Sequence, residues 1–262
     1  MPRVLGVDLA WGQGRPGVPP NETGVVAVDE DGTVVDAGWT RGVAETAAWM
    51  ATWGPTDAIA MVDAPLVVTN PTGMRDCDRE IGRRYGRWKV SANAVNLGLP
   101  GVLAGVALAA ELAPAGWRID DGRAGPRCRG RWLTECFPYL ALVGTPELGY
   151  DVERPVYKRR PRHLTPAEFR QRRAANTDEI IRRLAGVQDP PLGLRTHPVT
   201  AALLDEPTPL ADRPAKHRED LLDAALCAWT GLVWLHHGFA RCQVLGTSPS
   251  TVIAPCRPEQ RR

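Results

Sequence analysis

The sequence predicts an α/β domain with a five-stranded mixed sheet, three antiparallel strands followed by parallel ones, and helices on both faces. The first observation behind this prediction is that three extended segments open the chain, two of them joined by an Asp-Gly turn. The second is a continuously apolar segment at residues 58–62, which is typical of a central strand covered on both faces. The third is the alternation of helical and extended patterns after residue 42, which favours parallel strands.

The first half of the predicted sheet is an antiparallel unit. Its extended segments are residues 4–9, 23–28 and 33–38. An Asp-Glu-Asp-Gly turn joins the second segment to the third and predicts a hairpin. The stretch between the first and second segments is rich in glycine and proline, so we expect a loop there.

Helices and further extended segments account for most of the remaining chain. A helix is predicted to start at Arg75, and others cover residues 43–53, 101–112, 166–184, 198–204 and 219–236. The sheet is completed by strands at 58–62 and 132–137, and a further short extended segment lies at 251–254. No repeat and no long linker divides the chain. We therefore expect one domain spanning residues 1–262, with a basic insertion at about 151–175.

Composition and charge exclude several classes of protein. The 262 residues are 44% hydrophobic and 24% charged, which excludes disorder and collagen-like folds. A formal net charge of +2 does not indicate a uniformly basic nucleic-acid binder. No apolar stretch approaches the roughly 18 residues of a membrane span, and the six cysteines include no Cys-x-x-Cys pair of a zinc site. We expect a soluble, cytoplasmic protein with reduced thiols and no membrane partner.

Acidic side chains at strand ends and on the last helix are the candidate catalytic residues. Asp8 lies near the end of the first strand, Asp63 lies at the carboxyl end of the apolar strand, and Glu135 lies late on the strand at 132–137. Asp220 and Asp223 are three residues apart and therefore share one face of the last helix. Clustered carboxylates repel one another unless a cation neutralises them, and oxygen-only ligands suit Mg²⁺ or Mn²⁺. Two such ions about 3.5–4 Å apart promote phosphodiester hydrolysis.

Each acidic residue also has a structural alternative. Asp8 precedes a glycine-rich loop and is suited to a turn, and Asp63 precedes Ala-Pro, where strands end. Asp220 and Asp223 are predicted near a helix N-terminus, where the macrodipole stabilises carboxylates whatever their function. The joint placement of these residues, rather than any one of them, favours a metal site.

Six short motifs in a fixed order carry a resemblance to a known family. They are Gly6-Val7-Asp8-Leu9-Ala10-Trp11, Val62-Asp63-Ala64-Pro65-Leu66, Arg75-Asp76-Cys77-Asp78-Arg79, Glu135-Cys136-Phe137-Pro138, Tyr157-Lys158 and Asp220-Leu221-Leu222-Asp223-Ala224-Ala225. The chain resembles the family catalogued as domain of unknown function 429, often described as predicted ribonuclease-H-like nucleases. The last motif is also similar to the final helix of Holliday-junction resolvases. The resemblance implies a ribonuclease-H-like core with Asp8, Asp63 and Asp223 as metal ligands.

Two basic segments are candidate phosphate-binding regions. Residues 75–89 contain six basic and three acidic side chains, and residues 153–173 contain eight basic and two acidic side chains. We expect Arg75, Arg79 and Lys158 to contact phosphates, with Trp88 or Tyr157 available to stack on an unpaired base. The alternative is that both segments are solvated surface. His217, one turn before Asp220, is a candidate general acid or orienting residue.

The leading functional hypothesis is a metal-dependent nuclease acting on DNA or RNA. In this hypothesis Asp8, Asp63 and Asp223 hold Mg²⁺ or Mn²⁺, and Glu135 or Asp220 completes the site or orients the water. One alternative is a nucleotide hydrolase or phosphotransferase on the same fold. The glycine-rich stretch at 12–17 favours this alternative, because such enzymes bind phosphate with glycine-rich loops. Another is a non-catalytic nucleic-acid-binding protein. The chain contains neither a P-loop nor a nucleophilic-serine elbow.

Overall fold

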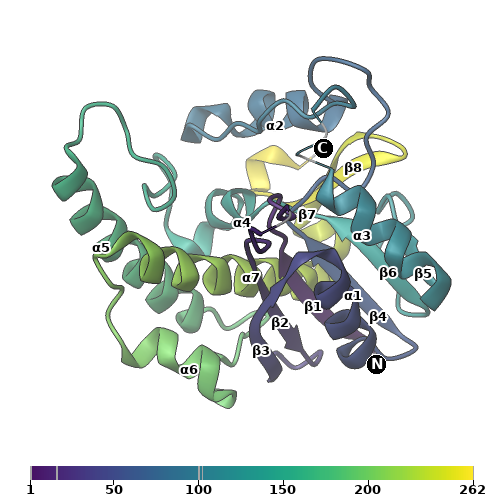
Figure 1. The fold of residues 1–262 in the computed structure, drawn as a ribbon, viewed down its shortest axis with the longest axis horizontal. Helices are drawn as coiled ribbons and strands as arrows, with labels where there is room; N and C mark the ends of the chain where they lie inside the picture. Colours follow the sequence, from purple (N-terminus) through teal and green to yellow (C-terminus); the bar gives the residue numbers. More distant parts are fainter. Residues whose placement is uncertain (1, 16, 100, 102, 262) are drawn as a thin grey trace.

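Six strands form the central sheet, in the spatial order β3-β2-β1-β4-β6-β5 (Figure 1). The structure is a computed structural model that describes residues 2–15, 17–99, 101 and 103–261. The strands are β1 (Arg3–Asp8), β2 (Glu22–Val28), β3 (Val34–Arg41), β4 (Ala58–Val62), β5 (Trp117–Ile119) and β6 (Arg131–Glu135).

The strand directions confirm the predicted mixed sheet. β1, β2 and β3 pair antiparallel, whereas β4 pairs parallel with both β1 and β6, and β5 pairs parallel with β6. This order of antiparallel and then parallel strands is the ribonuclease-H-like one that the sequence predicts. The sixth strand, β5, was not predicted, because three residues are too few to show a strand period.

Helices cover both faces of the sheet. Alternate side chains of β1 and β4 point to opposite faces, as the strand pleat requires. One face packs against α1 (Gly42–Trp53) and α3 (Ala104–Leu112), and the other packs against α7 (Asp212–His237). α7 lies along the sheet in Figure 1 and is buried from Arg218 to Trp234.

The remaining elements surround α7 and one edge of the sheet. The helices are α2 (Asp76–Tyr85), α4 (Pro138–Gly144), α5 (Pro166–Gly186) and α6 (Pro198–Asp205). β7 (Cys242–Thr247) and β8 (Ser250–Pro255) form a separate antiparallel pair. Single 3₁₀ turns lie at Gly86–Trp88, Ala113–Ala115, Pro146–Leu148, Leu194–Thr196, Gly238–Ala240 and Pro258–Gln260. Within the described ranges, no helix combines the length and apolarity needed to cross a bilayer.

Three local expectations need correction. The last helix starts at Asp212, seven residues before the predicted Glu219, so Asp220 and Asp223 are not at its N-terminus. Pro138 opens the unpredicted helix α4, because proline is well tolerated in a first helical turn. The predicted segment at 251–254 is part of β8 and pairs with β7 rather than with the main sheet.

Glycines allow α7 to lie directly on β1 and β2. A Cβ atom on Gly6 would stand 2.1 Å from the carbonyl oxygen of Ala224, and one on Gly24 would stand 2.0 Å from that of Asp220. Side chains cannot occupy such positions, so glycine is required for this close approach. The contact fixes the Asp220 turn of α7 beside the end of β1.

Replacing Gly24 by alanine is therefore expected to lower the free energy of unfolding by about 1–3 kcal/mol, the usual cost of overpacking. The matched control is Gly38→Ala on the neighbouring strand β3, where an added Cβ meets nothing within 4 Å. Urea denaturation of both variants measures the difference. Equal unfolding midpoints would show that α7 does not depend on this contact.

Candidate active site

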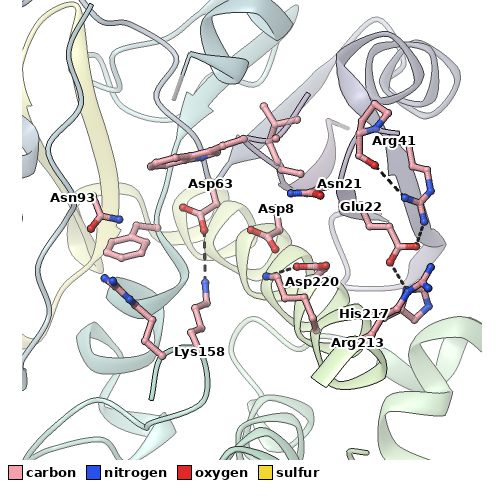
Figure 2. Close-up of a pocket in the computed structure, with 18 of the residues that line it drawn as sticks. Asp8, Asn21, Glu22, Arg41, Asp63, Asn93, Lys158, Arg213, His217 and Asp220 are labelled. Carbon is pink, nitrogen blue, oxygen red and sulfur yellow. Dashed lines mark hydrogen bonds and ion pairs between the residues drawn. The ribbon is translucent and has the colours of Figure 1, made fainter. Parts of the chain in front are cut away.

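A pocket of about 830 Å³ opens where the carboxyl ends of β1 and β4 meet α7. Its acidic lining residues include Asp8, Asp63 and Asp220, and Figure 2 shows Asp8 between the other two. These residues come from three elements that are far apart in sequence. The predicted gathering of acidic side chains at one edge of the sheet is present for these three.

The parallel pairing of β1 with β4 positions Asp8 and Asp63. Val7 lies opposite Val62 in the register, and the Asp63 N–H continues the ladder by donating to the Val7 carbonyl at 2.8 Å. Because both strands end at this edge, their terminal aspartates both reach the pocket.

Asp220 and Asp223 are both on α7, but they have different surroundings. Asp220 lines the pocket, and its Oδ1 is 2.5 Å from Nζ of Lys216, whose side chain is 58% exposed. Asp223 is fully buried and does not line the pocket. The two aspartates are therefore not equivalent, although each lies on the helix face turned to β1.

Both carboxylate oxygens of Asp223 already have partners. The Tyr157 hydroxyl donates to Oδ1 at 2.7 Å, and Nζ of Lys158 lies 2.6 Å from Oδ2. Lys158 also reaches towards Asp63, with Nζ 3.8 Å from Oδ2 (Figure 2). Asp223 Oδ2 has this ion pair but no hydrogen bond. The arrangement differs from the expected one, because Asp223 lies behind the pocket and Asp220 stands in the accessible position.

Burial raises the pKa of the acidic groups in and behind the pocket. The pKa of Asp220 is raised to about 8, first by burial and then by the charge of Asp8. Burial raises the pKa of Asp223 to about 7 against the opposing effect of Lys158. The pKa of Asp63 is also well above its usual range, because burial outweighs the attraction of Lys158. The ionised forms of these carboxyl groups are therefore disfavoured despite the nearby Lys158, and a bound cation would stabilise them.

Glu135 and Arg75 form a buried ion cluster rather than part of the pocket lining. The Arg75 guanidinium donates to both Glu135 oxygens, at 2.8 and 2.6 Å, and to both Asp78 oxygens, at 3.0 and 2.8 Å. Arg75 is only 5% exposed, which corrects its predicted role in binding phosphate. Arg79 is exposed but pairs with Asp76, and it does not line the pocket.

A second group of potential metal ligands lies in this cluster. Within the described part of the chain, ligand atoms of Cys77, Asp78 and Glu135 form the one set of three within 4.8 Å of one another. Arg75 already neutralises both carboxylates, and burial raises the pKa of Cys77 to about 12, so its thiol stays protonated. We therefore assign this cluster a structural role. The pocket aspartates are more widely spaced.

Arginines that sequence reasoning did not single out line the rest of the pocket. They are Arg41, Arg154, Arg159 and Arg213. Arg159 and Arg213 are exposed, and neither forms an ion pair with any residue that the structure describes. The basic segment before α5 contains Arg159, so its dense charge was a usable signal. Arg213 lies in the first turn of α7, which the sequence did not predict to be helical.

The aromatic residues near the pocket also differ from the predicted ones. Trp88 and Tyr157 are buried, at 1% and 0% exposure, and neither is available to stack on a base. Trp11, Phe137 and Tyr139 line the pocket instead. His217 lines it too, but its ring stacks on Trp39 and its Nδ1 is 2.7 Å from a Glu22 oxygen.

The fold and the pocket define an α/β protein of ribonuclease-H-like strand order with carboxylates gathered at the ends of its central strands. The chain belongs to the family described as Protein of unknown function (DUF429), whose sequence profile matches residues 6–245. That match covers every motif on which the resemblance rests. The comparisons with curated proteins and with solved structures gave no match.

Proposed function

We propose that the protein is a metal-dependent nuclease that hydrolyses phosphodiester bonds in a nucleic acid. The observation that carries this proposal is the meeting of Asp8, Asp63 and Asp220 in one pocket whose walls carry four arginines. Acidic groups there favour a divalent cation, and the arginines favour a polyanionic substrate.

The donor set fits Mg²⁺ or Mn²⁺. All three pocket aspartates offer oxygen ligands. Burial raises the pKa of Asp63 and of Asp220, and a bound cation would lower both again. Their wide spacing matches an ion that keeps several waters and is held by one or two carboxylates together with substrate phosphate. We propose that these one or two ligands come from Asp8, Asp63 and Asp220, which replaces Asp223 by Asp220 in the predicted set.

The chain's own residues bind and orient the substrate in this proposal. Arg159 and Arg213 lie on the pocket wall without ion-pair partners among the described residues, so they are free to contact phosphates. Lys158 directs an ammonium group to the same space. A divalent cation at the aspartates supplies the charge that activates water and neutralises the leaving oxygen. Asp223 and Tyr157 hold Lys158 in place.

Cleavage assays with labelled substrates test this proposal. Single-stranded DNA, single-stranded RNA, duplex DNA and an RNA–DNA hybrid are incubated with purified protein and Mn²⁺. We expect cleavage of at least one substrate, its loss in EDTA, and its recovery when Mn²⁺ is restored. Cleavage that survives EDTA, or that Asp63→Asn leaves at the wild-type rate, would contradict the proposal.

A nucleotide hydrolase is the second candidate, because Gly12 and residues 18–21, at the two ends of the glycine-rich loop, line the same pocket. The sequence Gly-Gln-Gly-Arg-Pro-Gly at 12–17 has the spacing of a dinucleotide-binding loop. It leads from β1 to the antiparallel strand β2, however, and not into a helix whose N-terminus would bind phosphate. Mg²⁺-dependent ATP turnover without cleavage of any nucleic acid would favour this candidate.

We also infer a cytoplasmic location. All six cysteines are unpaired, and five of them are buried. Disulfides form in oxidising compartments, so a chain with six free thiols fits a reducing one.

A further inference from the structure

Tyr157 and Lys158 act together on one buried carboxylate. Tyr157 donates its hydroxyl to one oxygen of Asp223, and the Lys158 ammonium pairs with the other. Asp223 is 0% exposed, so it would be strongly destabilising there without these partners. The two adjacent residues therefore supply one oxygen of Asp223 with a hydrogen bond and the other with a counter-charge.

The segment that carries Lys158 is held in place by other contacts. The Arg154 N–H donates to the Trp88 carbonyl at 3.0 Å, and the Asn176 side chain donates to the Val156 carbonyl at 2.9 Å. The Tyr157 ring meets the Tyr139 ring edge-on at 5.2 Å between centroids. The Lys158 ammonium is thus a fixed charge, unlike that of the exposed Lys216.

Lys158 also faces the proposed metal ligands. Its side chain is 18% exposed and lines the pocket, and Nζ is 3.8 Å from an Asp63 oxygen. An ammonium between Asp63 and Asp223 places its single positive charge near both carboxylates, closer to Asp223 than to Asp63. A divalent ion placed between the same two residues would have to displace this charge or be repelled by it.

We propose that Lys158 serves as the second cation of the site, in place of a second metal ion. The pocket then takes one divalent ion, held by one or two of Asp8, Asp63 and Asp220, and the Lys158 ammonium contacts a non-bridging oxygen of the scissile phosphate. Asp223 is a positioning residue that holds Lys158. This inference rests on the proposed function for the identity of the substrate, but the number of ions bound is measurable without any substrate.

Counting Mn²⁺ ions tests the inference. The whole protein is titrated with Mn²⁺, and free Mn²⁺ is measured by its electron paramagnetic resonance signal. The difference from the total Mn²⁺ added gives the number of ions bound per chain. We expect one ion for wild type and two for Lys158→Met, since the freed oxygens of Asp63 and Asp223 then accept a second. The matched control is Lys216→Met, which removes the other pocket lysine. We expect this variant to bind a single ion, as wild type does, but with higher affinity.

The possible outcomes separate this inference from the proposed function. Two ions bound to wild type would overturn the role of Lys158 and leave a nuclease site standing. No bound ion would contradict the metal site itself, and the inference with it. One ion on both wild type and Lys158→Met would also overturn the inference. If circular dichroism shows that Lys158→Met is unfolded, Lys158→Gln takes its place. The number of ions bound to wild type already decides between one ion and two.

Discussion

Replacing Asp8 by asparagine is expected to lower the rate of Mn²⁺-dependent cleavage by about a thousandfold or more. Asp8 is the central carboxylate of the pocket, between Asp63 and Asp220 (Figure 2). An amide keeps the size of the side chain but removes the charge that binds the cation. A thousandfold loss corresponds to about 4 kcal/mol of transition-state stabilisation. Single-turnover cleavage of the best substrate measures it.

The control for Asp8→Asn is the same substitution at Asp205, which is exposed on α6 and pairs with Arg195 away from the pocket. Asp205→Asn is expected to cleave at the wild-type rate. Both variants should keep the wild-type circular dichroism spectrum. Equal cleavage by Asp8→Asn and wild type would remove Asp8 from the proposed site.

Replacing Arg75 by methionine is expected to lower the free energy of unfolding by about 3–5 kcal/mol, the usual cost of breaking a buried ion pair from one side. The guanidinium is 4% exposed, and it is the cation that neutralises both Asp78 and Glu135. Methionine is an unbranched side chain that fills part of the same space, but it leaves the two buried carboxylates without their positive partner. Urea denaturation, followed by fluorescence, measures the change.

Arg79→Met is the matched control for Arg75→Met. Arg79 lies one turn along α2, and its ion pair with Asp76 is exposed at 48% and 53%. Exposed pairs contribute little to stability because water and salt screen them. We expect a midpoint close to that of wild type for Arg79→Met. A similarly small effect of Arg75→Met would contradict the structural role of the buried cluster.

The positions of Asp8 and Asp63 were predictable because they depend on a local pattern. An apolar strand followed by aspartate places the carboxylate at a strand end, and parallel pairing brings two such ends together. The contact of α7 with β1 and β2 was not predictable in the same way. It requires the absence of a Cβ at Gly6 and Gly24, and a glycine within a strand is equally typical of a bulge or a tight bend.

The choice between Asp220 and Asp223 could not be made from their spacing. Residues three apart share a helix face, but that face is wide enough for one carboxylate to point into a pocket and the other into the core. The difference comes from Tyr157 and Lys158, which are more than 60 residues away in sequence. The pairing of Arg75 with Glu135 is also long-range, separated by 60 positions, and no local pattern predicts it.

The most direct test of the proposed metal site is a crystal of the protein soaked in Mn²⁺, with anomalous diffraction recorded to locate the ion. We predict one anomalous peak in the pocket, in contact with oxygens of Asp8, Asp63 or Asp220, while Lys158 remains paired with Asp223. A pocket without an anomalous peak, or a peak only at Cys77, Asp78 and Glu135, would contradict the proposed site.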